Sequence, residues 1–172
     1  MSVLQQMQYY MRALIGKTVH GIGRASDMVW ILIGAKATTN EATEEPKGKG
    51  EYALHIQCPW RLRRMDNDEI VFASDDIYRP INEQEWNDEF EWDMLGNSVF
   101  DIVSKQWHAK CGQAAITHVE ISASGDLAMQ LSNGDVLEIF INTTADTECW
   151  RLFVRGHDEA HLVATGTSVS FQ

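Results

Sequence analysis

The residues with the clearest chemical character are acidic and lie close together between Glu83 and Asp93. This segment holds six carboxylates and no basic residue, and tryptophan and phenylalanine side chains are interspersed among them. Carboxylates attract a basic protein and aromatic side chains anchor it, so the segment suits a docking surface. An acidic helix whose aromatic side chains face the core is the alternative. The candidate partner-binding residues are Asp75, Asp76, Glu85, Trp86, Asp88, Glu89, Phe90, Glu91 and Trp92.

A second candidate site combines polar and aromatic residues from separate segments of the chain. On a strongly curved sheet they could line a pocket with converging polar groups, as in a small-molecule binding protein or an enzyme. The arginines near Trp60 could instead pair with carboxylates of the same acidic chain. The candidate pocket residues are His55, Trp60, Arg61, Trp150 and Arg151.

The sequence offers weaker signals for metal or cofactor binding. His157 and His161 have the spacing of two zinc ligands on a helix, but Gly156 and the flanking strands favour a turn. The glycine pattern GIGRAS, at 21–26, lacks the third glycine of a dinucleotide site. We therefore predict no metal site, no cofactor and no catalytic residue.

Composition and charge narrow the class of protein. A chain of 172 residues fits one domain over 1–172, and its net charge of −11 disfavours nucleic-acid binding. No apolar run is long enough to span a membrane, and the first residues lack the layout of a secretory signal. We expect a cytoplasmic protein. Its three widely spaced cysteines are then buried, reduced thiols: Cys58, Cys111 and Cys149.

The elements that must position these residues are mostly strands. Apolar and polar residues alternate over 116–122, 127–132 and 149–154, and an apolar run covers 136–141. Asn133-Gly134 suits a tight hairpin turn, so the stretch 116–153 predicts a four-stranded antiparallel meander. Further strands are expected over 18–23, 28–33, 51–60, 69–73 and 162–171.

Helices are expected in three places. One stripe of a helix over 2–15 holds Leu4, Met7, Met11 and Leu14. A polar, flexible loop is expected over 36–50. Asn82 can cap a short helix that begins at Glu83. Ser98 and Asp101 form a capping box for a helix over 99–110, whose buried face should hold Val99, Val103 and Trp107, joined by Phe100 and Ile102. We predict an α+β fold: a mostly antiparallel sheet, strongly curved or a partly open barrel, with the helices packed on it.

Several motifs together resemble a small bacterial family of stand-alone cytosolic proteins. They lie between Glu51 and Phe153: YALHIQCPWRL, IVFASDDIY, GNSVFD, NGD with VLEIFIN, and ECWRLF. The resemblance implies one β-rich domain, and it carries over no activity and no site residue. We expect a protein-binding module with a basic protein partner, in particular an immunity-type inhibitor of a bacterial toxin. The alternatives are the small-molecule binder or enzyme described above and a structural subunit of a homo-oligomer.

Overall fold

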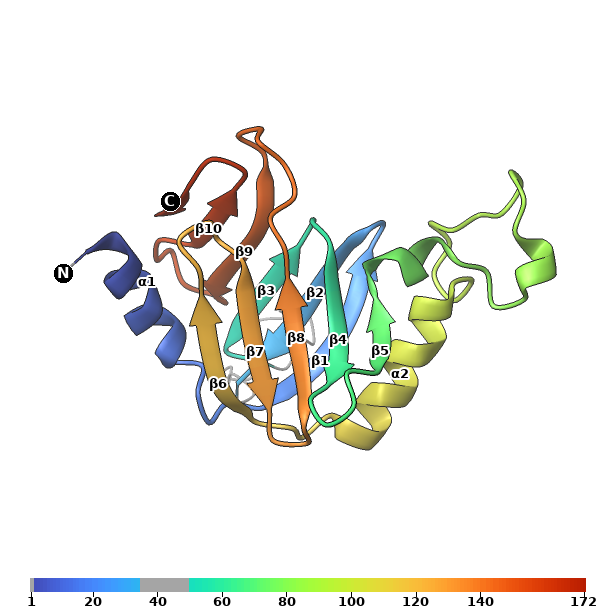
Figure 1. The fold of residues 1–172 in the computed structure, drawn as a ribbon, viewed down its shortest axis with the longest axis horizontal. Coiled ribbons are helices and arrows are strands. Elements are labelled where there is room, and N and C mark those ends of the chain that lie inside the picture. The colour runs from blue at the N-terminus through green and yellow to red at the C-terminus, as the bar shows by residue number, and fades with distance from the viewer. Residues whose placement is uncertain (1, 35–49) are drawn as a thin grey trace, which may run out of the picture.

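The computed structural model describes residues 2–34 and 50–172 and has the predicted α+β fold (Figure 1). Within these residues, eleven strands form two antiparallel sheets. The first has the order β1-β2-β3-β9-β10-β11, with bounds Val19–Ala25, Met28–Ile33, Tyr52–Ile56, Glu148–Val154, Leu162–Thr165 and Val169–Phe171. The second has the order β5-β4-β8-β7-β6, with bounds Ile70–Ala73, Trp60–Arg64, Asp135–Ile139, Leu127–Leu131 and Ile116–Ile121. Except for Gly50, the loop predicted over 36–50 lies outside the described residues.

Two helices flank the sheets and pack on them, as predicted (Figure 1). The first, α1 (Val3–Arg12), begins after Ser2, whose hydroxyl accepts a hydrogen bond from the backbone of Gln5. It packs beside β6 and buries Met7 and Met11. The second, α2 (Val99–Cys111), packs against β1 and β5. Across residues 2–34 and 50–172, no helix is long and apolar enough to cross a membrane.

The chain changes sheet between Ile56 and Trp60. The single strand expected over 51–60 is instead two strands, since β3 ends at Ile56 and β4 begins at Trp60 in the other sheet. Pro59 explains the break, because proline has no backbone N–H with which to continue a ladder. The Pro59 carbonyl instead accepts a hydrogen bond of 2.9 Å from the backbone of Phe140.

Three of the four strands expected over 116–153 form the predicted meander, in which β6, β7 and β8 pair in sequence. Gly134 in the turn before β8 has a φ angle of 86°, a conformation that favours glycine. The fourth strand, β9, instead crosses to the first sheet and lies between β3 and β10. Alternation identifies the two faces of a strand but not its partner, so this crossing was not predictable from the pattern. The last strand, expected over 162–171, is the hairpin of β10 and β11.

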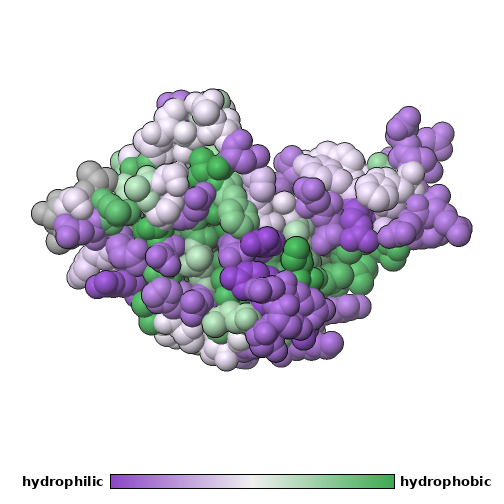
Figure 2. Space-filling model, viewed as in Figure 1, coloured by the Kyte–Doolittle hydropathy of each residue, from purple (hydrophilic) through white to green (hydrophobic). Residues whose placement is uncertain are grey.

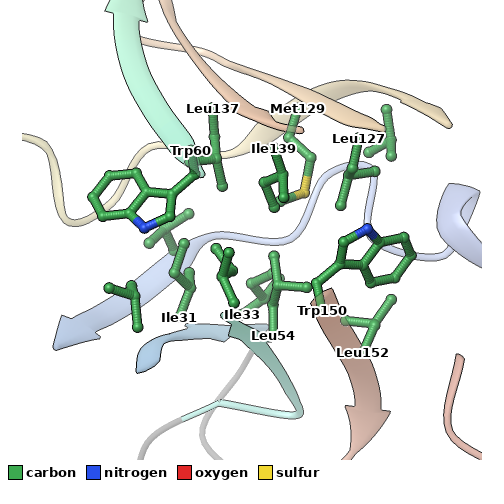
Figure 3. Packing of buried hydrophobic residues seen from close by; sticks show 14 of the residues in the cluster. Ile31, Ile33, Leu54, Trp60, Leu127, Met129, Leu137, Ile139, Trp150 and Leu152 are labelled. Carbon is green, nitrogen blue, oxygen red and sulfur yellow. The ribbon is translucent and has the colours of Figure 1, made fainter. Parts of the chain in front are cut away.

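The two sheets face each other across one apolar core (Figure 3). Leu54 and Ile33 of the first sheet lie opposite Ile139 of the second, and all three are fully buried. Trp60 and Trp150 lie toward opposite ends of the labelled cluster. The indole nitrogen of Trp150 donates a hydrogen bond of 2.7 Å to the carbonyl of Gly125. This bond satisfies a polar group that would otherwise be costly in the core.

The buried face of α2 differs from the one expected. Ser98 caps the helix and forms the predicted capping box with Asp101. Val99 and Val103 are only half buried, however, and Ile102 is 36% exposed. The helix buries Phe100 and Trp107 as expected, together with Asp101 and Ser104, which were not expected there. Apolar spacing alone misplaced the face, because a charged residue, Asp101, occupies the buried side.

Candidate functional site

The predicted acidic segment is a loop that projects from one end of the molecule (Figure 1). It runs over 80–98, and we call it the acidic loop. Pro80 and Ser98 form an isolated antiparallel bridge at its neck, where the backbone N–H of Val99 donates a bond of 2.8 Å to the carbonyl of Arg79. The loop therefore leaves and rejoins the body at one point.

The helix expected from Glu83 is limited to one 3-10 turn over Glu83–Glu85. Asn82 caps this turn as predicted, and its side chain accepts a hydrogen bond of 3.2 Å from the backbone of Gln84. The helix does not continue, because the side chain of Asn87 accepts the backbone N–H of Glu89 at 2.9 Å. Local bonds of this kind compete with helical ones, and the closely spaced carboxylates also repel one another on a helix.

A buried ion pair holds the neck of the acidic loop. Arg24 of β1 donates from Nε and Nη2 to the two carboxylate oxygens of Asp101, at 2.8 and 2.7 Å. Arg24 Nη2 also donates to the carbonyl of Met94 at 3.1 Å, inside the loop. Asp101 Oδ2 accepts the backbone N–H groups of Gly96 and Ser98 at 2.8 and 3.2 Å. The pair thus ties β1, α2 and the end of the loop together.

These hydrogen bonds determine the ionisation of Asp101. Burial raises the pKa of a carboxyl group, but here the bonds from Arg24, Gly96 and Ser98 outweigh it and lower the pKa of Asp101 to about 2. Asp101 is therefore ionised at neutral pH, and the neck carries a matched pair of charges.

Aromatic contacts hold the inner side of the acidic loop. The rings of Trp92 and Tyr78 meet edge to face, with centroids 4.9 Å apart, and the Tyr78 hydroxyl donates to Asp27 at 3.1 Å. Tyr78 belongs to the 3-10 turn η1 (Ser74–Tyr78), which follows β5. Burial and the bond to Asp27 raise the pKa of Tyr78. Trp92 and Phe90 are half buried, so these side chains stabilise the loop and contribute little to its outer surface.

The outer surface of the acidic loop is both apolar and negatively charged. Its exposed apolar side chains are Ile81 at 57%, Trp86 at 61%, Met94 at 51% and Leu95 at 67%. Five of its carboxylates make no ion pair with residues 2–34 or 50–172: Glu85, Asp88, Glu89, Glu91 and Asp93. Figure 2 shows mostly hydrophilic surface at the projecting end. Such a surface can bring both unneutralised charge and apolar area to a contact.

The structure separates the two aspartates that were grouped with this segment. Asp75 is exposed on η1 and faces solvent. Asp76 is half buried, pairs with Arg79 at 2.9 Å and accepts the backbone N–H of Ala73 at 2.9 Å. Asp76 therefore has a structural role at the base of the loop.

The five residues of the predicted pocket lie in three different places. Trp60 and Trp150 are buried in the core, at 3% and 0% exposure. Arg61 lies on the outer face of the second sheet, where its Nε donates to Glu138 at 2.6 Å. His55 and Arg151 are cross-strand neighbours on the outer face of the first sheet. The structure thus brings together only His55 and Arg151.

His55 and Arg151 belong to a compact polar and aromatic cluster on that outer face. Arg151 pairs with Glu148 at 2.7 Å, and its Nη1 lies 2.9 Å from His161 Nδ1. Phe153 stacks on His161 and meets His55 edge to face. Burial lowers the pKa of His55. Within the cluster, Arg151 is thus bound by Glu148 and His161, and the His55 ring packs against Phe153.

His157 and His161 lie in the connection between β9 and β10, where a turn was predicted in place of a zinc-binding helix. In the part of the chain that the structure describes, no group of three or more histidine, cysteine, aspartate and glutamate side chains is placed to hold a metal ion.

No family model, no curated protein and no solved structure matches the chain. The candidate site is therefore described from the contacts and exposure of its own residues. Sequence reasoning missed the Arg24–Asp101 pair and the exposed pair Met94 and Leu95. A carboxylate three residues into an apolar helix, where Asp101 stands, is the one signal that could have indicated a buried partner.

Proposed function

We propose that the protein is a protein-binding module that holds a basic partner against the acidic loop. The observation that carries the proposal is the combination of unpaired carboxylates with exposed apolar side chains on a loop whose neck is fixed by Arg24 and Asp101. A loop held in place before binding loses less conformational entropy when the partner docks.

The two kinds of side chain support different steps of binding. The carboxylates attract a basic surface over several ångströms and speed the encounter, most strongly at low ionic strength. Trp86 and Leu95 then bury apolar area, and exposed aromatic side chains of this kind dominate binding energy in protein interfaces. The partner should therefore present lysine or arginine around an apolar depression.

We further propose that the basic partner is a bacterial toxin and that this protein is its immunity-type inhibitor. A toxin that acts on nucleic acid needs a basic active-site surface, since it must contact the phosphate backbone. A net charge of −11 and an acidic, apolar loop would complement and cover such a surface. Self-association into a homo-oligomer remains a different use of the same exposed side chains, and light scattering of the purified protein separates the two.

A pull-down from the native host with two matched variants tests this proposal. The first variant reverses Glu85, Asp88, Glu89 and Glu91 to lysine and should lose the partner that the unaltered protein captures. The second reverses four exposed acids elsewhere, with the same change of net charge: Asp68, Glu120, Asp158 and Glu159. It should keep the partner. Capture of the same proteins by both variants would show that the acidic loop is not the docking surface.

A further inference from the structure

A groove lies beside the last turns of α2, away from the N-terminal end of the helix, where the neck of the acidic loop is. It has a volume of about 490 Å³, within the range of small-molecule sites. Its walls come from α2, from the β4–β5 connection and from the β7–β8 turn, so three separate segments build it. None of its lining residues belongs to the acidic loop.

A buried carboxylate forms one wall of this groove. Asp135, at the start of β8, is 6% exposed, and its Oδ2 accepts hydrogen bonds from Trp107 Nε1 and Asn133 Nδ2, both at 2.7 Å. Its Oδ1 accepts no hydrogen bond from the residues the structure describes, and no arginine or lysine among them pairs with it. A carboxylate held in place by two hydrogen bonds and with a free acceptor oxygen suits a cationic donor.

Two cations lie on the same groove, although the chain as a whole is strongly acidic. Lys110 forms no ion pair with residues 2–34 or 50–172. Arg64 is the cross-strand neighbour of Asp135, but its Nε lies 3.6 Å from Glu69 instead, in a half-exposed pair that contributes little. These side chains can meet an anionic group at the groove.

The groove also has apolar walls, beside the polar side chains of Asp66, Gln106 and Asn133. Met65, Val71, Val103 and the indole of Trp107 line the groove, and Met65 is 48% exposed. Burying them against an apolar group would add the hydrophobic contribution that a small ligand needs for measurable affinity.

We propose that this groove binds a small zwitterion of amino-acid type with an apolar side chain. Asp135 receives the ammonium group, Lys110 and Arg64 receive the carboxylate, and the apolar walls hold the side chain. A ligand with only one of the two charges leaves either the carboxylate or the cations unmatched, so both charges are required. This site goes beyond the proposed protein binding and does not depend on it.

Calorimetric titration with L-phenylalanine and the dipeptide L-alanyl-L-phenylalanine tests the proposal, and the two probes differ in the spacing of their charges. Phenethylamine lacks the carboxylate and 3-phenylpropionate lacks the ammonium group. We expect at least one zwitterion to bind, and each single-charge analogue to bind at least about tenfold more weakly. If neither zwitterion binds at about 10 mM, or if one single-charge analogue binds as tightly as its zwitterion, the proposal is overturned.

Three variants assign the contacts. Asp135→Asn keeps an oxygen for the Trp107 hydrogen bond while removing the charge, and it should weaken zwitterion binding at least about tenfold. Lys110→Gln should do the same. Lys105→Gln removes an equal charge from an exposed position of the same helix outside the groove, and it should bind like the unaltered protein. Equal binding by all three variants would contradict this location of the site.

Cys111 gives an independent readout, because its half-buried thiol lines the groove. A bound zwitterion should slow alkylation of Cys111 by N-ethylmaleimide, and Lys110→Gln should reduce this protection at the same ligand concentration. Binding in the calorimeter without protection at Cys111 would place the ligand elsewhere.

Discussion

Arg24 and Asp101 lie 77 residues apart in the chain and form a bidentate ion pair that is nearly inaccessible to water, with side-chain exposures of 1% and 7%. The pair joins the edge strand β1, the first turn of α2 and the end of the acidic loop. Buried ion pairs contribute little net stability on average, but the removal of one partner leaves the other charge unmatched. Substitution of one partner at the neck should therefore destabilise the protein more than the net contribution of the pair suggests.

Asp101→Asn should destabilise the protein by about 3–5 kcal/mol, because it leaves the buried guanidinium of Arg24 without a counter-charge. Urea denaturation followed by circular dichroism measures the change. The matched control is Asp68→Asn, which removes an aspartate that is 84% exposed in its pair with Arg63 and should cost less than about 1 kcal/mol. Similar losses in both variants would mean that burial does not distinguish the pairs.

The same ion pair should make stability depend on pH in the acidic range. The pKa of Asp101 is about 2 in the folded protein against an ordinary value of 3.8, so folding favours the ionised form. This contribution is fully present above about pH 4 and is lost as the pH falls toward 2, and it amounts to roughly 2 kcal/mol. Urea unfolding at several pH values measures it. Relative to the unaltered protein, Asp101→Asn should show a shallower loss over that window, and parallel curves would contradict the assignment.

Local signals in the sequence predicted much of this fold. The capping box at Ser98 placed the start of α2, and the alternation with Asn133-Gly134 placed β6, β7 and β8. These features depend on residues a few positions apart, which a pattern can reveal. The acidic segment was expected to be a helix from Glu83, but only the 3-10 turn Glu83–Glu85 forms, since side-chain bonds such as that of Asn87 override helical spacing.

The features that were not predictable join distant parts of the chain. The crossing of β9 to the first sheet and the pairing of Arg24 with Asp101 depend on which segments meet in three dimensions. The burial of Asp135 was not predictable either, because a polar residue after Asn-Gly is typical of an exposed turn. Only the packing of Trp107 over it shows that the carboxylate is buried.

Trp150→Phe should cost about 1–3 kcal/mol of unfolding free energy. The substitution keeps an aromatic ring in the core but removes the indole N–H that donates to the Gly125 carbonyl at 2.7 Å. The carbonyl of the buried Gly125 is then left without its partner. Trp86→Phe is the matched control, because Trp86 is 61% exposed, and it should change stability by less than about 0.5 kcal/mol. An equal effect of both substitutions would show that the Gly125 bond does not stabilise the core.

The three cysteines should differ in reactivity in the native protein. Cys58 and Cys149 are buried, and burial raises the pKa of both thiols, that of Cys58 to about 12. At pH 8 only about one Cys58 in ten thousand is then a thiolate, which is the reactive form.

Cys111 is half exposed beside the α2 groove. Ellman's reagent should therefore titrate Cys111 in the native protein and all three thiols in urea. Reaction of two or three thiols at one rate without denaturant would contradict the burial of Cys58 and Cys149. Cys111→Ser should remove the native reaction and leave the other two thiols to react only after unfolding.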